Sequence, residues 1–383
     1  MRPSALTCLL DVRKRIRLVI ATEAEQPEAR ANSRPTRRGW RHILAVGVGR
    51  LNLLAIVATV LALVFAYLWP TDLSQTGTAH VFLAFVAFMV RTFEFHLGLA
   101  LLAGMLLALA LKRYRSVIVC LPFLIATLGP PVWSQFGAKE RKDAGGLRVL
   151  SSNLLYANTD MQPFLDEVRE SNPDVILIQE YTPEHAASLR PRLAVLYPYR
   201  VEAFHRSAFG EAIYSKRAFI GEPVEYPQPV RPDGSRDTGV INLNDPQLRV
   251  VIEHAGREVV VQNIHTVPPT TFDASLVLFR EQRWMIGWIR DWARAEQRPI
   301  VMAGDFNCTP SSPHAAELRE AGLIDVHAAV GSGRGATWPA KGRFAALPGI
   351  RIDQAFVKGL DPVSIRVGRY VGSDHRPIIF DVK

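Results

Sequence analysis

Apolar and polar positions divide this chain into two unlike parts. Leu51–Trp69 is a run of 19 residues with one polar amide and no charge, long enough to cross the hydrocarbon of a bilayer as a helix. Phe93–Leu111 is a second apolar run, with Glu94 and His96 near its start, and Ser116–Trp133 is a third, shorter one that contains three prolines. The pattern predicts about three transmembrane helices, at residues 51–69, 93–111 and 116–133, within a membrane region of residues 43–133.

The segments around these runs have different patterns. Ala79–Val90 is apolar but only twelve residues long, which favours an interfacial segment or an extension of the second helix. Residues 1–42 carry two basic clusters and no sustained periodicity, which is typical of a disordered cytoplasmic arm. Residues 134–146 are polar and are interpreted as a linker to a soluble domain of residues 147–383.

In the soluble domain, short apolar runs alternate with amphipathic stretches. The runs have the length of strands, and the stretches have the helical period of apolar positions. The expected strands are 147–153, 174–179, 199–204, 212–214, 248–254, 258–265, 300–303, 351–357 and 377–382, and the expected helices are 161–170, 183–192, 274–295 and 314–320. Helices interleaved with both isolated strands and hairpins indicate a mixed α/β or α+β sandwich.

The net charge of +9 is unevenly distributed. Residues 1–133 hold 15 Lys and Arg against 6 Asp and Glu, whereas residues 134–383 hold 30 of each. The basic character therefore belongs to the segments that flank the membrane, which argues against a strongly basic nucleic-acid-binding body. The three cysteines lie far apart and only Cys308 is in the soluble domain, so they form neither a zinc pattern nor a disulfide within that domain.

The stretch Ile300–Asn307 contains the clearest candidate chemistry. Its apolar start is typical of a buried strand, and Asp305 and Asn307 leave the end of that strand while Phe306 points the other way, because side chains alternate across a strand. A carboxylate and an amide two residues apart suit a hard cation or a water to be deprotonated. Taken alone, the same pair is equally typical of a turn after a strand.

Five further stretches place an acceptor or an imidazole at the end of an expected strand. They are Ser151–Asn153, Gln179–Glu180, Asn263–His265, Arg351–Asp353 and Ser373–Pro377. Ligands collect at strand ends in open α/β sheets, so we expect these stretches to converge on one crevice. Each stretch alone has an ordinary structural alternative, such as a helix cap, a core histidine or a turn. Six together in this order favour a functional site.

The side chains in these stretches are carboxylates, amides and histidines, without cysteine. Oxygen-rich ligation suits Mg²⁺, Mn²⁺ or Ca²⁺ better than zinc. Two histidines beside such a metal suit phosphate oxygens that carry developing charge. Asp353 is the expected partner that orients His375, because the adjacent Asp374 cannot face the same imidazole in an extended chain.

The motifs occur in a fixed order along the chain: Ser-x-Asn, Gln-Glu, Asn-x-His, Gly-Asp-Phe-Asn, Thr-Trp, Arg-Ile-Asp and Ser-Asp-His-Arg-Pro. In this order they resemble the endonuclease/exonuclease/phosphatase superfamily, over residues 148–382. The spans ahead of the domain look like a bacterial membrane-anchored branch of it. The resemblance implies a deoxyribonuclease-like four-layer α/β sandwich with two central mixed β-sheets. One departure is Lys216, where relatives often have arginine.

The resemblance also implies which residues hold a metal. Glu180 would be the principal ligand, with Asn153 beside it. Asp305 would contribute to the same centre, and Asp374 would support the metal network or the water. The implied ion is Mg²⁺, or alternatively Mn²⁺ or Ca²⁺.

The remaining matches are implied to be catalytic. Asp305 would activate or position the attacking water, and Asn307 would hold both. His265 and His375 would donate to the non-bridging phosphate oxygens, and Asp353 would orient His375. The reaction so implied is in-line hydrolysis of a phosphoester at a metal centre.

Several substrates fit a membrane-anchored phosphoesterase of this kind. The expected reaction is hydrolysis of a phosphodiester, by a nuclease acting on DNA or RNA or by a phospholipid or sphingomyelin phosphodiesterase. The non-enzymatic alternative is an inactive domain that binds phosphate or lipid. The expected partners are the lipid bilayer and the phosphoester substrate, and no protein partner can be inferred from the sequence.

Charge also predicts the topology. The basic arm before Leu51 and the cluster Lys112–Arg115 belong in the cytoplasm by the positive-inside bias, and Thr71–Thr78 between them lacks Lys and Arg. A third span then carries the soluble domain to the periplasmic side of the inner membrane. If that third segment lies in the interface instead, the domain faces the cytoplasm.

Overall fold

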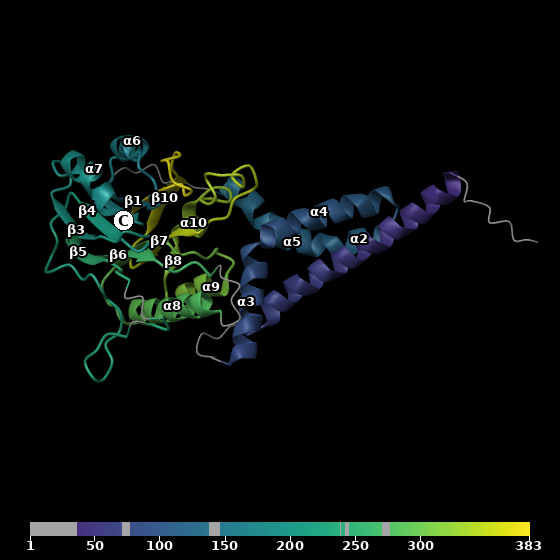
Figure 1. Ribbon diagram of the computed structural model, residues 1–383, viewed down its shortest axis with the longest axis horizontal. Coiled ribbons are helices and arrows are strands. Elements are labelled where there is room, and N and C mark those ends of the chain that lie inside the picture. The colour runs from purple at the N-terminus through teal and green to yellow at the C-terminus, as the bar shows by residue number, and fades with distance from the viewer. Residues whose placement is uncertain (1–36, 71–76, 138–145, 238, 242–244, 270–275) are drawn as a thin grey trace, which may run out of the picture. The chain divides into compact units, whose positions relative to one another are not determined.

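A computed structural model describes residues 37–70, 77–137, 146–237, 239–241, 245–269 and 276–383 (Figure 1). Most of the expected arm and of the expected linker lies outside these residues. The chain divides into two compact units, Met1–Asn52 and Leu53–Lys383. The second unit contains the whole sheet structure and the helices from Thr78 onward.

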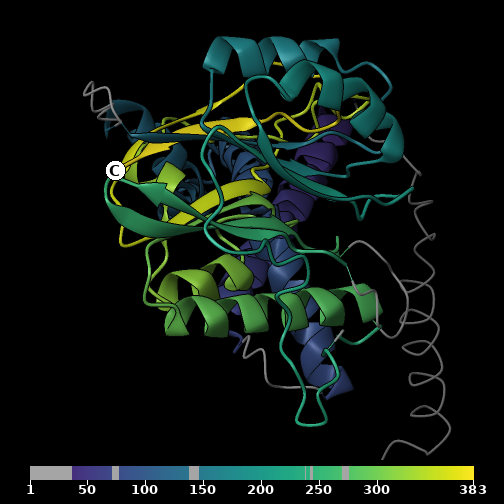
Figure 2. The same ribbon diagram turned by 90° about the vertical axis from the view of Figure 1, so that its left-hand side faces the viewer.

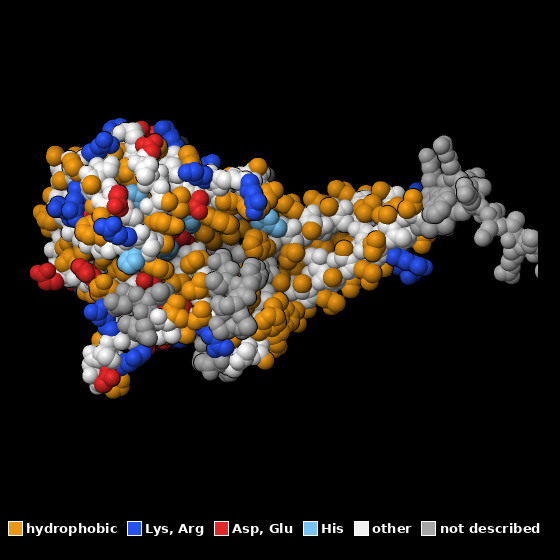
Figure 3. Space-filling view, viewed as in Figure 1, with side chains coloured by type: hydrophobic (Ala, Val, Ile, Leu, Met, Phe, Trp, Pro, Cys, Tyr) orange, Lys and Arg blue, Asp and Glu red, His pale blue; other side chains and the backbone are white. Residues whose placement is uncertain are grey.

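In the described part of the chain, four helices precede the first strand. They are α2 (Arg37–Leu68), α3 (Thr78–Thr92), α4 (Glu94–Ala110) and α5 (Tyr114–Gly137). Two segments, Leu44–Leu68 and Tyr114–Gln135, are long and apolar enough to cross a membrane, and α3 with α4 forms a third candidate that is bent by 65°. Hydrophobic side chains cover the surface of α4 and α5, whereas Lys, Arg, Asp and Glu side chains are scattered over the domain that follows (Figure 3).

The short helix α3 packs against the soluble domain. Its apolar face contributes Val81, Ala84, Phe85 and Phe88 to a buried cluster that also contains Phe279 of α8 (Val277–Ala295). The rings of Phe85 and Phe279 meet edge to face at 5.3 Å. The expected interfacial segment or helix extension is therefore a separate helix whose apolar side is covered by protein.

The soluble domain is a four-layer sandwich with two central mixed sheets, as expected (Figure 2). The first sheet has the order β10-β11-β1-β2-β4-β3 and the second β5-β6-β7-β9-β8. The strands of the first sheet are β1 (Leu147–Asn153), β2 (Val175–Gln179), β3 (Tyr199–Ala203), β4 (Glu211–Ser215), β10 (Pro362–Val367) and β11 (Ile378–Val382). Those of the second are β5 (Arg249–His254), β6 (Arg257–His265), β7 (Ile300–Asp305), β8 (Ile324–Asp325) and β9 (Asp353–Lys358).

Helices cover the outer faces of both sheets. The helices α6 (Gln162–Ser171) and α7 (Pro183–Leu193) pack on the first sheet, and α8 and α9 (Pro313–Glu320) pack on the second (Figure 2). The short α10 (Val326–Val330) follows β8. Between the sheets lies a separate core of mostly β-branched and aliphatic side chains, for example Val149, Leu177, Val261 and Val301.

Each sheet contains one parallel pair of strands. Helix α6 connects β1 to β2, and α8 connects β6 to β7, which are the crossovers that parallel strands require. Asn153 is thereby level with Gln179, and His265 is level with Asp305. The polar strand ends of each pair meet at one edge of their sheet.

A buried amide pair joins the two sheets near this edge. Gln179 Nε2 donates to Asn263 Oδ1 at 2.6 Å, and Asn263 Nδ2 donates to the Ile178 carbonyl at 2.8 Å. Both amide side chains are fully buried. Because an unpaired polar group in this core is costly, the pair fixes how the two sheets face each other.

The Arg-Ile-Asp motif contains a buried ion pair. The Arg351 guanidinium donates from two nitrogens to the two carboxylate oxygens of Asp325, each at 3.0 Å. Asp325 also caps α10 by accepting from the Ala328 N–H at 3.0 Å. Burial opposes ionisation, but the Arg351 charge holds the pKa of Asp325 below its usual value. Arg351 thus anchors the start of β9, two residues before Asp353.

Replacing Asp325 by asparagine should destabilise the protein strongly. Asparagine keeps the helix cap but leaves the Arg351 charge buried and unpaired, which costs about 3–5 kcal/mol. The measurement is the denaturant-unfolding midpoint of the detergent-solubilised full chain.

The stabilisation by Asp325 should depend on pH, and the direction of its pKa shift determines where the stabilisation is lost. The pKa of Asp325 is depressed in the folded state, so its contribution is present above the unfolded pKa and is lost as the pH falls. The wild type and Asp325→Asn should converge below about pH 4. Asp166→Asn, which removes an exposed carboxylate paired with Arg169, is the control and should shift the midpoint little. An equal shift in both variants would contradict the role of the buried pair.

Candidate active site

Ends of strands from both sheets converge on one site. Glu180 directly follows β2, and Asn153 ends β1 beside it. Asp305 and His265 end β7 and β6 in the other sheet. Glu180 has a left-handed backbone with φ of 57°, which is uncommon for a non-glycine residue and is concentrated at functional sites.

The Asn153 side chain joins carboxylates of the two sheets. Its Nδ2 donates to Glu180 Oε1 at 2.9 Å and to Asp305 Oδ2 at 3.1 Å. Its Oδ1 accepts from the Leu155 N–H at 2.9 Å. The amide nitrogen therefore faces the site and the amide oxygen faces the backbone. In this geometry Asn153 spaces the two acids and presents no oxygen to a cation between them.

Glu180 is held at both of its oxygens. While Oε1 accepts from Asn153, Oε2 accepts from the Tyr156 N–H at 2.8 Å. Burial raises the pKa of Glu180, and the two hydrogen bonds act in the opposite direction. A nearby cation stabilises the ionised form of such a carboxylate and so offsets the cost of burying its charge.

Asp305 lies between two imidazoles. Its Oδ2 is 3.7 Å from His265 Nε2 and 3.6 Å from His375 Nε2. Its Oδ1 accepts from the Asn307 N–H at 2.9 Å, in a tight turn where Asn307 has a left-handed φ of 46°. At Gly304 a Cβ would meet the Ile264 carbonyl oxygen at 1.8 Å, so only glycine permits β7 to approach β6 this closely before Asp305.

The two histidines differ in charge. Burial lowers the pKa of His265, which is therefore neutral at physiological pH. Burial acts on His375 in the same direction, but the charges of Asp353 and Asp305 outweigh it and raise the pKa of His375 to about 10. Burial raises the pKa of Asp305 to about 6, against the attraction of His375. One face of Asp305 thus meets a neutral ring and the other a cation.

Asp353 holds the His375 ring. His375 Nδ1 donates to Asp353 Oδ2 at 2.9 Å, which leaves Nε2 directed toward Asp305. The backbone N–H of Asp353 donates in turn to Thr337 Oγ1 at 3.2 Å. The structure therefore brings together Asp353 and His375, the pair that the sequence predicted, and places the Thr337 hydroxyl against the backbone of Asp353.

Asp374 and Asn307 also line the site. Asp374 Oδ2 accepts from Trp338 Nε1 at 3.3 Å, and its Oδ1 is buried without a hydrogen-bond partner among the described residues. The Asn307 side chain donates to the Thr266 carbonyl at 2.7 Å. The Thr-Trp motif, which had no assigned role in the sequence, thus supports both Asp353 and Asp374.

This set of side chains fits a divalent cation. Glu180, Asp305 and Asp374 bring carboxylates to one pocket, and no Lys or Arg is among the described residues that line it. Ligand atoms of Asp305, Asp353 and His375 also lie within 4.8 Å of one another. However, a protonated His375 has no lone pair for a metal. The hard oxygen donors Glu180 and Asp374 are therefore the better anchors for Mg²⁺, Mn²⁺ or Ca²⁺.

The pocket at this site has a volume of about 400 Å³. Its polar lining contains every predicted site residue except Asn153 and Asp353. Its remaining wall is apolar and includes Phe88, Met89 and Phe93 from the junction of α3 and α4. These three residues were not among the sequence candidates, because an apolar run beside a candidate membrane span gives no signal for a binding site.

Lys216 lies away from the site. It follows β4 at the end that pairs with Val175, whereas the site is at the Gln179 end. Its ammonium donates to Asn172 Oδ1 at 2.5 Å and lies over the Tyr197 ring. The departure from the arginine of relatives therefore concerns packing at the opposite edge of the sheet.

Comparison with known proteins identifies a family. Residues 148–375 match the model of the Endonuclease/Exonuclease/phosphatase family. No curated protein matches the chain. Among solved structures, one from Beutenbergia cavernae, described as an endonuclease/exonuclease/phosphatase, has 22% identity over 62% of this chain and 71% of that chain, with a TM-score of 0.46. One from Bacteroides vulgatus has 17% identity over 62% and 99%, with a TM-score of 0.48. The 3′ phosphatase NExo from Neisseria, bound to a product DNA hairpin, has 17% identity over 62% and 99%, with a TM-score of 0.44.

Replacing Asp353 by asparagine should lower the pKa of His375 from about 10 toward the ordinary histidine value of about 6.5. The variant removes the charge that faces Nδ1, so the imidazolium is lost as the pH rises through the lower value. The measurement is an NMR pH titration of the ¹³C-labelled histidine rings in the full chain.

Asp374→Asn is the matched control. It removes a nearby charge that is not hydrogen-bonded to the ring, so its effect on the His375 titration should be smaller. If the two variants shift the titration equally, the charge of Asp353 has no special part in raising the pKa of His375.

Proposed function

The chain belongs to the Endonuclease/Exonuclease/phosphatase family, and from this premise we propose that it is a membrane-anchored, divalent-metal-dependent phosphoesterase. The observation that carries the proposal is the link between the two sheets at Asn153, which holds Glu180 and Asp305 at one edge beside two histidines of different charge. The proposed proton acceptor Asp305, the cationic donor His375 and the proposed cation ligands Glu180 and Asp374 then line one pocket of about 400 Å³.

Asp305 is the proposed acceptor for the proton of the attacking water. It is buried, its Oδ1 is fixed by the Asn307 N–H, and its pKa of about 6 is close to the working range of a general base. His265 and His375 flank it at 3.7 and 3.6 Å. Their Nε2 atoms are the proposed donors to the phosphate oxygens, and the positive charge of His375 stabilises negative charge that develops there.

Glu180 and Asp374 are the proposed anchors of the cation, with Asp305 close to them. When bound, a divalent cation supplies charge to polarise the phosphoester and to favour ionisation of water. Asn153 keeps Glu180 and Asp305 apart at a fixed distance. The role proposed for Asn153 is therefore positioning of the acids.

The possible functions of this site differ in the substrate and in whether that substrate is hydrolysed. A nuclease acting on DNA or RNA and a phosphodiesterase acting on phospholipid or sphingomyelin would use the same side chains. An inactive domain that only binds phosphate or lipid has no need of the buried Asp353–His375–Asp305 arrangement, whose charges are costly to bury. This arrangement favours an enzyme.

Chelation by EDTA should abolish hydrolysis of bis(p-nitrophenyl) phosphate by the purified full chain, and excess Mg²⁺ or Mn²⁺ should restore it. Glu180→Gln and Asp305→Asn should each lower kcat by on the order of a hundredfold or more, because one weakens the cation site and the other removes the proton acceptor. The measurement is release of p-nitrophenolate at pH 8.

Glu170→Gln is the control for these variants. Glu170 is an exposed residue of α6, away from the pocket, and its carboxylate pairs with Arg369. Removing the charge of Glu170 should therefore leave kcat unchanged. Wild-type rates in both Glu180→Gln and Asp305→Asn would show that the site is assigned wrongly.

The proposed location is the inner membrane of a bacterium, with the catalytic domain on the periplasmic side. Two basic segments favour the cytoplasm: Arg37, Arg38 and Arg41, before the apolar segment Leu44–Leu68, and Lys112–Arg115 after α4. The apolar part of α5, Tyr114–Gln135, is 22 residues long and is the proposed span that carries the chain outward.

Fusions to the C-terminus test this topology. Alkaline phosphatase fused after Lys383 should be active, and a fluorescent protein that folds only in the cytoplasm should stay dark at the same position. Fusions after Leu111, which ends the preceding helix, should give the opposite pair of results. An inactive phosphatase with a bright fluorescent fusion after Lys383 would place the domain in the cytoplasm.

A further inference from the structure

The pocket has two chemically distinct walls. One wall carries Glu180, Asp305, Asp374 and the two histidines. The rest of the lining is mostly apolar and forms the apolar wall, which includes Phe88, Met89, Phe93, Phe209, Trp338 and Ile352. A site for a compact, fully polar phosphoester has no need of an apolar wall of this extent.

Part of the apolar wall comes from the membrane region itself. Phe88 and Met89 are in the last turns of α3, and Phe93 is the residue at which the chain bends by 65° into α4. The helix α4 that starts there is the most apolar helix of the chain as described, with Glu94 as its only acidic residue. The wall of the pocket is thus continuous along the chain with a membrane span.

Hydrogen bonds fix this bend to the catalytic domain. Arg91 Nε donates to the Ser311 carbonyl, and the Ser311 hydroxyl donates to the Glu94 carboxylate. His96 Nε2 donates to the Pro348 carbonyl at 2.6 Å. The guanidinium of Arg334 lies 3.7 Å from the centre of the Phe95 ring. The bend is therefore held at several points on both of its sides.

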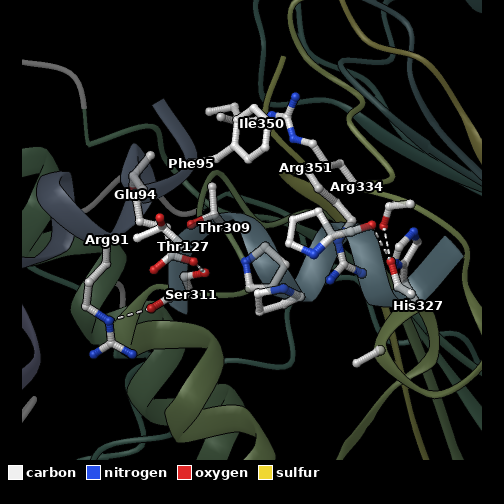
Figure 4. Close-up of a pocket in the computed structure, with 17 residues that line it drawn as sticks. Arg91, Glu94, Phe95, Thr127, Thr309, Ser311, His327, Arg334, Ile350 and Arg351 are labelled. Carbon is white, nitrogen blue, oxygen red and sulfur yellow. Dashed lines mark hydrogen bonds between the residues drawn. The ribbon is translucent and has the colours of Figure 1, made fainter. Parts of the chain in front are cut away.

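Figure 4 shows the far side of the same bend, where Arg91, Glu94 and Phe95 surround a second cavity with Ser311 and Arg334. This cavity has a volume of about 320 Å³ and shares Thr92 and Ile350 with the lining of the active-site pocket. Charged side chains line it, in contrast to the wall formed by Phe88, Met89 and Phe93. The bend thus turns a polar side to the second cavity and an apolar side to the active site.

Charge argues against a polyanion in the active-site pocket. None of the described residues that line it is Lys or Arg. Proteins that bind nucleic acid neutralise several phosphates with Lys and Arg and obtain most of their affinity that way. A single phosphoester with an apolar substituent matches one group of site residues beside one apolar wall.

We propose that the substrate is an amphiphilic phosphoester, a lipid of the membrane in which the chain is anchored. Its phosphate lies at Asp305 and its apolar chain lies against Phe88, Met89 and Phe93. The proposal rests on the phosphoesterase function proposed above and adds the substrate class. Met89 and Phe93 act as specificity-determining residues, since they contact the apolar part and not the reacting atoms.

A homologous series of substrates tests the proposal in the purified full chain. Methyl, hexyl and dodecyl p-nitrophenyl phosphate share one reacting group and one leaving group and differ only in the alkyl chain. Each methylene that enters an apolar site contributes up to about fourfold in binding. We expect kcat/KM to rise at least tenfold from the methyl to the hexyl ester, measured below the micelle-forming concentration.

The variants alter the apolar wall and are scored by the ratio of hexyl to methyl kcat/KM. Phe93→Asn and Met89→Gln should lower this ratio severalfold, and Phe93→Leu should keep most of it. Phe93 is 38% exposed, so its replacement does not open the core. The control is Phe82→Asn, which changes a residue of the same type on α3 that is 54% exposed and outside the pocket lining, and should keep the wild-type ratio.

The outcomes separate the two proposals. If the methyl ester is hydrolysed and the ratio is near one, the lipid proposal fails and the phosphoesterase function stands. If no ester is hydrolysed with Mg²⁺ or Mn²⁺ present, the phosphoesterase function fails. Cleavage of a single-stranded DNA oligonucleotide more efficiently than the hexyl ester, with steep salt dependence, would overturn the lipid proposal in favour of nucleic acid. A ratio lowered equally by Phe82→Asn would also overturn it.

Discussion

The site depends on one amide nitrogen that bridges the two sheets. Asn153 Nδ2 donates to Glu180 in its own sheet and to Asp305 in the other, at 2.9 and 3.1 Å. Two buried carboxylates this close repel each other when both are ionised, and the amide offsets part of that repulsion. The pair of sheets must therefore meet in one register and at one distance. The hydrogen bonds of the buried amides Gln179 and Asn263 impose the same requirement on the two sheets. The relative position of Glu180 and Asp305 therefore follows from how the sheets face each other.

Buried charge is distributed unevenly around the site. Asp353, His375 and Asp305 form a chain of alternating charge in which each group stabilises the next, and the Thr337 hydroxyl holds the first of them by its backbone. Arg351 stands two residues from Asp353 but neutralises Asp325 on the other side of the strand. This separation matters for chemistry. An arginine directed into the pocket would compete with a divalent cation for the carboxylates, whereas the guanidinium of Arg351 is already paired with Asp325.

The sequence was sufficient for the elements with strong local patterns and for the residues at their ends. Short apolar runs located most strands of both sheets, and the polar residues at the ends of these runs included Glu180, Asp305 and His375. The edge strands β8 and β10 were missed: β8 has only two residues, and β10 begins with a proline although Val363, Ile365 and Val367 alternate with polar residues. The orientation of Asn153 could not be predicted, since spacing does not determine which amide atom faces a pocket. The apolar wall was missed for a related reason: periodicity shows that α3 has an apolar side, but not which surface covers it.

The place of α3 in the hydrophobic core has a consequence for how the protein is made. Val81, Ala84, Phe85 and Phe88 leave the ribosome long before Phe279, their partner in α8. The catalytic domain therefore completes its core only against a helix that is made before it. If the chain is anchored as proposed, membrane insertion of the apolar helices precedes this step, and a chain that fails to insert would leave an apolar face on α8 uncovered. Such a face is a target for chaperones and proteases, so under the proposed anchoring the fold provides a checkpoint that favours activity at the membrane.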